Sequence, residues 1–190
     1  MDEERTTFSD DESLADVDDQ VSQLMAAQTG VEADELQDFW SVASRYARLG
    51  DLEVFMGTPW SEALAPEAWS FGDSADLANE LLALVLAGKK TATTGLYQEY
   101  VDEEEPLPKV GDLSIILDGA SHPRALVRDQ EVVITTFGDV TPEQAAAEGE
   151  GDRTLESWRQ AHREVWERRG LAITDDTKVV WERFKVLYSV

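Results

Sequence analysis

The sequence contains no cysteine and only two histidines among its 190 residues. Without thiols the chain has no disulfide, no thiolate nucleophile and no cysteine-ligated zinc, which fits a reducing cytoplasm. Two histidines are too few for a multi-histidine metal site, and we expect neither a metal nor a cofactor. The glycine-rich Walker and Rossmann phosphate-binding patterns are also missing, so the common nucleotide-binding classes are excluded.

The chain also lacks a long hydrophobic run. No apolar stretch approaches the roughly 20 residues that span a bilayer. Its first residues, MDEERTTFSDDES, contain no basic segment followed by an apolar one, as a signal peptide would. We therefore expect a soluble, cytoplasmic protein that does not bind membranes.

Positive charge is scarce. The chain has 40 Asp and Glu residues against 16 Lys and Arg, which gives a formal net charge of −24 and a pI near 4.2. Such a field repels nucleic acid and anionic membranes at long range. A nucleic-acid ligand must therefore meet a local basic patch, or be as small as a nucleoside.

Composition divides the chain into three parts. Residues 1–30 hold nine acids and one base, and we expect a flexible acidic segment there. Apolar residues at helical spacing within it leave open a short amphipathic helix that docks on the domain. Residues 31–68 are expected to form a helical extension packed on the domain, and residues 69–190 form the main domain.

The pattern of apolar residues predicts an α+β fold. Helices are expected over 36–50, between Ser74 and Gly88, over 141–147 and over 155–169. A capping box with proline, Thr141-Pro142-x-Gln144, opens the third of these. Strand signals occur in LSIIL, RALVR, EVVITTF and KVVWERFKVLY, with a turn at Asp118-Gly119 after the first. Because strands and helices do not alternate regularly, we expect a small mixed or antiparallel β-barrel flanked by helices, not a parallel sheet.

The stretch LAGKKTATTGL, residues 86–96, holds two lysines and three threonines in an acidic chain. Lysines at a helix C-terminus are stabilised by the helix dipole, so Lys89 and Lys90 are explained as capping residues. Thr91 and Thr93 would then begin a strand and share one of its faces. The alternative is chemical: a lysine amine takes the proton of a threonine hydroxyl, with Lys90 acting on Thr93.

A second candidate is the loop AEGEGD, in which Glu148, Glu150 and Asp152 alternate with glycines. The glycines allow the backbone to approach a ligand closely. One carboxylate would serve as a general acid or base, or would bind an amino group of a base. A hard-cation site and a solvated loop between two helices are the other interpretations.

The two histidines are given structural roles. His162 falls on the apolar face of the last predicted helix, four residues after Trp158, and is expected to be a hydrogen-bonded core residue. His122 lies beside a proline in the predicted hairpin and is expected at the surface.

Four motifs in order resemble the longer bacterial members of the ASCH domain family (activating-signal-cointegrator homology). They are FGDSADLANELLALVLAGKKTATTGL, LPKVGDLSIILDG, EGEGDRTLESWRQAH and VVWERFKVLY. The similarity runs from about Trp69 to Tyr188, so residues 69–190 would be the ASCH domain. The resemblance implies a β-barrel related to PUA domains, with a cleft where RNA or a modified nucleoside sits.

The resemblance also implies site residues. Small bacterial members of the family include amidohydrolases that remove the acetyl group from N4-acetylcytidine. Their lysine, threonine and glutamate correspond to Lys90, Thr93 and Glu150, with Glu148 as the alternative glutamate. The neighbouring polar residues expected to contact substrate are Lys89, Thr91, Glu148 and Asp152. Gly95 stands where those enzymes have an arginine, so the resemblance does not extend to that contact.

Three functions follow from the resemblance, and whether the chain is an enzyme stays open among them. The first is a nucleoside deacylase, an amidohydrolase acting on a compound such as N4-acetylcytidine. The second is a non-catalytic RNA-binding module, since the family is mostly discussed as RNA-binding. The third is a ribonuclease, an activity also described within the family. The expected partner is a modified nucleoside or short RNA, and the sequence does not predict the oligomeric state.

Overall fold

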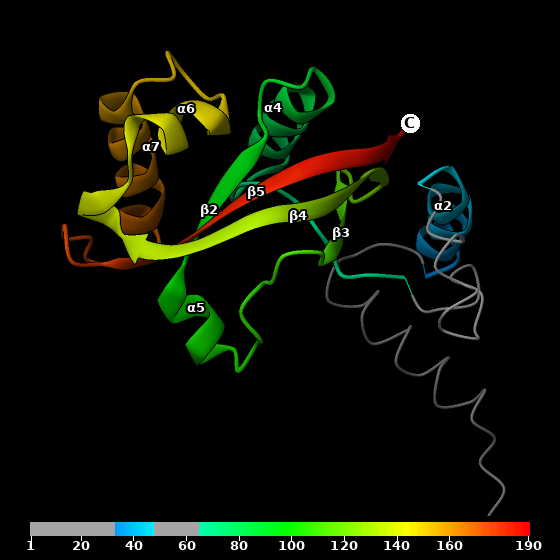
Figure 1. The fold of residues 1–190 in the computed structure, drawn as a ribbon, viewed down its shortest axis with the longest axis horizontal. Coiled ribbons are helices and arrows are strands. Elements are labelled where there is room, and N and C mark those ends of the chain that lie inside the picture. Colours follow the sequence, from blue (N-terminus) through cyan, green and yellow to red (C-terminus); the bar gives the residue numbers. More distant parts are fainter. Residues whose placement is uncertain (1–32, 48–64) are drawn as a thin grey trace, which may run out of the picture.

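The computed structural model describes residues 33–47 and 65–190. Its centre is a five-stranded sheet in the order β1-β3-β4-β5-β2 (Figure 1). The β1–β3 pair is parallel and the other three pairs are antiparallel. The strands are β1 (Ala68–Trp69), β2 (Ala92–Leu96), β3 (Leu113–Leu117), β4 (Pro123–Thr136) and β5 (Lys178–Ser189).

Helices lie around this sheet. They are α2 (Ala33–Tyr46), α4 (Ala75–Leu86), α5 (Tyr97–Asp102), α6 (Pro142–Glu148) and α7 (Leu155–Arg168), with a 3-10 turn η3 (Phe137–Asp139). In Figure 1 α6 and α7 lie together at one end of the sheet and α2 lies at the other. The expected α+β fold, a mixed sheet flanked by helices with an N-terminal helix, is confirmed. Among the helices of the described residues, none combines the length and apolar character that crossing a bilayer requires.

The predicted helix ends are confirmed where side chains cap them. The hydroxyl of Ser74 accepts a hydrogen bond from the Leu77 amide at the start of α4. At the start of α6, Thr141 and Gln144 form the complete capping box. These caps satisfy amides that the first helical turn leaves without partners, so short polar motifs were enough to locate both starts.

Two short elements were not expected from the sequence. Helix α5 has no buried residue and therefore no apolar stripe, and β1 is only two residues long. RALVR and EVVITTF belong to one strand, β4, whose register shifts between Asp129 and Glu131. Such a bulge keeps the strand continuous while it bends, so the polar residues between the two apolar runs do not end it. The expectation for residues 1–30 lies outside the described residues, and so do residues 31–32 and 48–64 of the expected helical extension.

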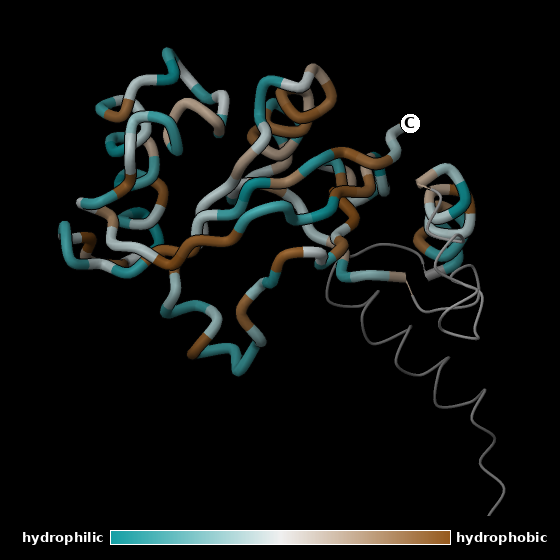
Figure 2. Tube along the Cα trace, in the orientation of Figure 1, coloured by the Kyte–Doolittle hydropathy of each residue, from teal (hydrophilic) through white to brown (hydrophobic). Residues whose placement is uncertain are grey.

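The core consists of three clusters of buried side chains. Residues alternate along β3: Ile115 and Leu117 pack with α2, whereas Ile116 packs with α4. This alternation follows the two-residue period of a strand and places helices against both faces of the sheet. The third cluster joins the far ends of β2 and β5 to α6 and α7. Figure 2 shows the corresponding hydrophobic stretches along the strands and on one side of α4.

Helix α2 contributes to the first cluster mainly through Trp40, which is 1% exposed. Replacing Trp40 with alanine should lower the free energy of unfolding by about 3–5 kcal/mol, because a large buried side chain is lost and a cavity remains. Urea denaturation of the intact chain measures this difference. The control is Val42→Ala on the same helix. Val42 is 41% exposed, so this change should alter the free energy of unfolding by less than ~0.5 kcal/mol. Equal effects of both variants would show that α2 is not part of the cooperative core.

Candidate functional site

Lys90 is a buried cation. Helix α4 ends at Leu86. Gly88 follows with a left-handed φ of 67° and turns the chain so that Lys89 is exposed and Lys90 points inward. The Lys90 side chain is 1% exposed. Its Nζ lies 2.7 Å from Glu150 Oε1 and 3.3 Å from Glu148 Oε2. The ring of Phe71 covers the ammonium at 5.1 Å, so the lysine is held by two carboxylates and one aromatic face.

Glu148, the last residue of α6, is also 1% exposed. Its Oε1 accepts hydrogen bonds from Thr94 Oγ1 at 2.6 Å and from Trp158 Nε1 at 2.5 Å. Its Oε2 faces Lys90 and, at 3.4 Å, His162 Nε2. Burial alone would raise the pKa of Glu148, but the charges of His162 and Lys90 and the donated hydrogen bonds together lower it to about 2.

His162 completes this group. Its ring stacks on Trp158 with centroids 4.3 Å apart and meets Trp166 edge-on at 5.1 Å. Its Nδ1 lies 3.0 Å from the carbonyl oxygen of Trp158, which confirms the expected hydrogen-bonded core histidine. Burial opposes a charge on this ring, yet the Glu148 carboxylate outweighs burial and raises the pKa of His162. The protonated ring donates from both nitrogens, which matches its two acceptors.

The acidic loop is pressed against the lysine segment. Gly149 has a φ of 73°, and a Cβ there would lie 2.3 Å from the Lys89 carbonyl oxygen, so only glycine fits. The Thr91 amide and hydroxyl both donate to the Ala147 carbonyl, which fastens the end of α6 to the entry of β2. Glu150 therefore follows directly after a fixed point, and it keeps 24% of its side chain exposed.

Asp152 and Lys89 lie outside this cluster. Asp152 accepts hydrogen bonds from the amide and hydroxyl of Thr154, the N-cap of α7, and these bonds lower the pKa of its carboxyl. Lys89 is exposed. Of the residues expected at the site, Lys90, Glu148 and Glu150 are brought into contact, and Thr91 holds their two segments together.

The two neighbouring threonines of β2 face different surroundings. Thr94 pairs with Trp181 and bonds Glu148, whereas Thr93 pairs with Glu182 and lines a cavity. Successive side chains of a strand point to opposite sides, which explains the split. Within the described part of the chain, the Thr93 hydroxyl has no hydrogen bond to Lys90.

The cavity beside Thr93 has a volume of about 870 Å³ and holds a pair of acids, Asp129 and Glu182. Burial, followed by the charge of Asp129, raises the pKa of Glu182 to about 8. Burial raises the pKa of Asp129 to about 6. The two carboxyls hydrogen-bond each other, which requires one proton between them, and Tyr100 Oη donates to Glu182 at 3.4 Å.

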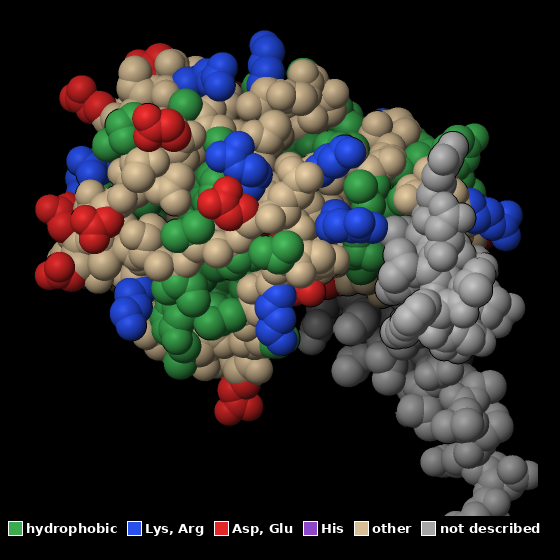
Figure 3. Space-filling view, viewed as in Figure 1, with side chains coloured by type: hydrophobic (Ala, Val, Ile, Leu, Met, Phe, Trp, Pro, Cys, Tyr) green, Lys and Arg blue, Asp and Glu red, His purple; other side chains and the backbone are tan. Residues whose placement is uncertain are grey.

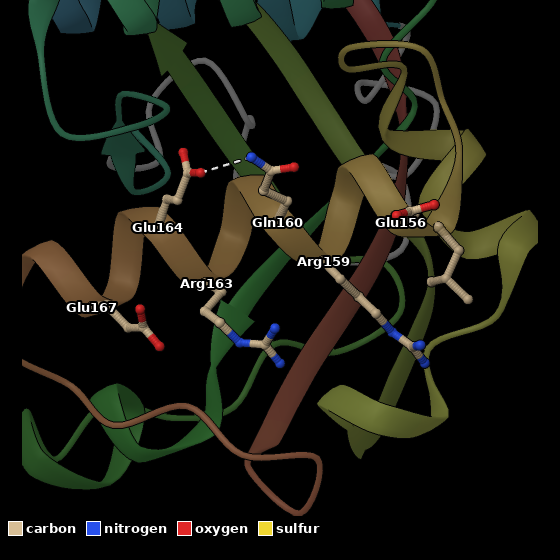
Figure 4. A pocket seen from close by; sticks show the side chains of 7 residues that line it. Glu156, Arg159, Gln160, Arg163, Glu164 and Glu167 are labelled. Carbon is tan, nitrogen blue, oxygen red and sulfur yellow. Dashed lines mark hydrogen bonds between the residues drawn. The ribbon is translucent and has the colours of Figure 1, made fainter.

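A second depression lies along the outer side of α7, with a volume of about 710 Å³ (Figure 4). Its arginines already have structural partners. Arg159 donates to the Gly138 carbonyl at 2.6 Å, and the guanidinium of Arg163 lies 5.0 Å from the centre of the Phe137 ring. Gln160 and Glu164 bond each other, as Figure 4 shows. Side chains engaged in this way explain the surface without a ligand.

Four contributing residues were missed by sequence reasoning. Trp158 and Thr94 bond the buried carboxylate, and Asp129 and Glu182 form the acid pair of the cavity. The sequence did contain an indication for Asp129 and Glu182, because both are acids within strands whose alternate positions are otherwise apolar. Charged residues at such positions are usually solvated, so only the fold separates them from an ordinary exposed face.

The mixed sheet with helices on both faces is an α+β domain, and its match to a solved ASCH domain makes it PUA-like. The ASCH domain family model matches residues 67–188, which is more than half of the sequence. The chain belongs to the ASCH domain family, and the expected resemblance is confirmed. No curated protein matches the chain.

Two solved structures extend this finding. A protein from Enterococcus faecalis is 34% identical, with 76% of this chain and 87% of that chain covered and a TM-score of 0.61. An ASCH domain from Lactobacillus crispatus is 27% identical, with 76% and 95% covered and a TM-score of 0.62. Both are similar in fold to this chain over most of their own length.

Replacing Glu148 with glutamine should lower the free energy of unfolding by about 3–5 kcal/mol, because it leaves two buried cations with one carboxylate fewer. Guanidinium denaturation at pH 7 measures the loss. Since the folded-state pKa of Glu148 is lowered to about 2, its contribution is present above pH ~4.5 and disappears as the pH falls towards 2. The difference in the free energy of unfolding between Glu148→Gln and the wild type should therefore become smaller as the pH falls from ~4.5 towards 2.

Glu164→Gln, on the exposed side of α7, is the control for this variant and should change stability by less than ~0.5 kcal/mol. A Glu148→Gln protein as stable as the control would contradict the role assigned to the buried carboxylate.

Replacing Glu182 with glutamine should stabilise the protein at pH 8 but not at pH 5. Both acids of the pair have raised folded-state pKa values, so the folded state retains protons that the unfolded state has lost between pH ~4 and 8. Wild-type stability therefore falls as the pH rises through that window, and the variant relieves the repulsion. We expect the Tm gain at pH 8 to be about 2–4 °C, equivalent to about 1 kcal/mol in a chain of this size.

Thermal unfolding at four pH values from 5 to 8 measures this change. Glu131→Gln removes an exposed acid of β4, the strand that carries Asp129, and should give a Tm difference that does not vary with pH. A constant difference for Glu182→Gln as well would show that the pair does not share a proton.

Proposed function

We propose that this ASCH domain protein is a hydrolase that removes an acyl group from a modified nucleoside such as N4-acetylcytidine. The observation that carries the proposal is the 2.7 Å contact between the buried Lys90 ammonium and the partly exposed Glu150 carboxylate. In this pair Lys90 is the proton donor and Glu150 the acceptor, and Glu150 is the one that reaches the surface. Thr93 supplies a hydroxyl three positions after the lysine.

The proposed chemistry divides between these three groups. A proton moves from Lys90 to Glu150 along their hydrogen bond, which leaves an amine that can act as a base and a carboxylic acid that can act as an acid. The Thr93 hydroxyl faces the cavity and has no hydrogen bond to Lys90, so the proposal requires it to move to the amine. The amine then takes the hydroxyl proton as the Thr93 oxygen attacks the acyl carbonyl carbon. Glu150 delivers its proton to the departing amino group of the base, and water then releases the acyl group from the threonine as a carboxylic acid.

Glu150 suits this role better than Glu148. Both oxygens of Glu148 are occupied by protein donors, and its pKa is lowered to about 2, so it holds no proton to exchange at neutral pH. Glu150 has Lys90 as its ion-pair partner among the described residues and is 24% exposed. Glu148 therefore orients Lys90, and Glu150 meets the substrate.

A non-catalytic RNA-binding module is the second candidate, because the ASCH family is thought to bind RNA. Lys89 is exposed beside the site and is suited to a phosphate. On the face shown in Figure 3, however, Lys and Arg side chains stand among acidic ones and do not gather into one patch. Tight binding of long RNA relies on several phosphate contacts, so this surface favours a small ligand.

The acids of the AEGEGD loop do not favour a metal-assisted ribonuclease. A catalytic cation needs several free carboxylate oxygens at one point. Glu148 is surrounded by protein donors and Asp152 accepts hydrogen bonds from Thr154, the N-cap of α7, which leaves Glu150.

Incubation of the intact protein with N4-acetylcytidine, followed by chromatography, tests the proposal. We expect cytidine and acetate as products. Thr93→Val removes the nucleophile and Glu150→Gln removes the proton carrier, and each should lower kcat by about 100-fold or more. Thr135→Val, a matched change on β4, should leave kcat within about twofold, which is less than ~0.5 kcal/mol.

Thr94→Val discriminates between the two adjacent threonines. It removes a hydrogen bond to Glu148 and should lower stability while preserving most of the turnover at a temperature where the variant is folded. Loss of turnover in Thr94→Val together with full turnover in Thr93→Val would overturn the assignment of the nucleophile. Absence of turnover in the wild type would overturn the proposed function.

A further inference from the structure

The cavity of about 870 Å³ is the large hollow next to a proposed catalytic residue. Thr93 and Gly95 of β2 form one wall, and Tyr100 of α5 and Glu182 of β5 form the adjoining one. Thr93 and Glu182 are direct partners across the β2–β5 ladder, so their side chains stand next to each other on the same side. A molecule that reaches the Thr93 hydroxyl from this side therefore contacts Glu182.

Acids dominate the lining. Of the twenty lining residues that belong to the described part of the chain, seven are Asp or Glu and none is Lys, Arg or His. Only Glu99 of these seven has an ion-pair partner within the described residues, Arg169 at 2.6 Å. Burial raises the pKa of Glu67, and the negative charges of Glu105 and Glu103 raise it further. An anionic group entering the cavity would be repelled by the same charges.

The remaining walls suit a flat, uncharged ligand. Tyr100 and Trp69 contribute aromatic surfaces, on which a base stacks without regard to its identity. The proton shared by Asp129 and Glu182 gives the floor both a donor and an acceptor, which match the amino or amide edge of a base. Gly95 keeps the wall open, since a Cβ there would stand 3.4 Å from the Tyr100 hydroxyl oxygen.

We propose that this cavity is the base pocket of the enzyme and that Asp129 and Glu182 restrict its substrates to nucleosides and similar amine derivatives that carry no phosphate. The inference rests on the proposed function, since it places the substrate beside Thr93. The inference adds a specificity that the proposed hydrolysis does not itself require. The carboxyl lining rejects the 5′-monophosphate of the same acylated nucleoside. Oligonucleotides are rejected for the same reason.

Calorimetric titration of the Thr93→Val protein tests this without turnover. The ligands are N4-acetylcytidine and its 5′-monophosphate, each at low salt and at 0.5 M NaCl. We expect the nucleoside to bind with little dependence on salt and the monophosphate to bind at least about tenfold more weakly, with a penalty that shrinks in high salt. Adding D129N and E182Q should reduce that penalty several-fold.

The control carries two charge removals on α7, Glu156→Gln and Glu164→Gln, which do not line the cavity. It should keep the full penalty, so a loss of global negative charge does not explain the result. Gly95→Arg provides a second measurement, because a cation placed on the cavity wall should favour the monophosphate over the nucleoside.

Three results would overturn the proposal: equal or tighter binding of the monophosphate, an unchanged penalty after removal of both acids, or no binding of the nucleoside. Failure of the proposed function is recognised separately, from wild-type turnover. A protein that binds the nucleoside selectively and does not hydrolyse it would retain the pocket and lose the activity.

Discussion

The buried carboxylate of Glu148 is the interaction on which the arrangement of this domain depends. It collects donors from three places in the chain: the turn before β2, β2 itself and two successive turns of α7. A charged oxygen without these partners would be very costly to bury, so the groups must assemble together. The carboxylate thereby fixes α6 and α7 against the end of the sheet and aims Lys90 at the acidic loop.

Charge balance explains why this cluster is stable inside the protein. Below the raised pKa of His162, Lys90 and His162 provide two positive charges, and Glu148 and Glu150 provide two negative ones. Lys90 and Glu148 are each 1% exposed and His162 is 12% exposed, whereas Glu150 keeps contact with the surface. Because these four charges sum to zero, the fold can keep the Lys90 ammonium in its interior. Glu150 is the member of the group that a ligand can contact from the surface.

The sequence predicted the parts of this arrangement that are local. Caps at Ser74 and Thr141 defined helix starts, and Gly88 defined the end of α4. Contacts between distant segments were less accessible: Lys90 and Glu150 are 60 residues apart, and only the family resemblance joined them. The acid pair in the cavity was missed, because strand alternation specifies which residues share a side but not what covers that side.

The two faces of strand β2 contact two different environments. Thr94 faces the neutral charge cluster and Thr93 faces the acidic cavity, so both halves of the proposed site depend on a single pairing with β5. Inserting or deleting one residue between Gly88 and β2 would shift the register by one residue, so that Thr93 would face the charge cluster and Thr94 would face the cavity. The length of the KKT connection is therefore as constrained as its chemistry, and relatives that change the lysines or threonines individually should still keep their spacing.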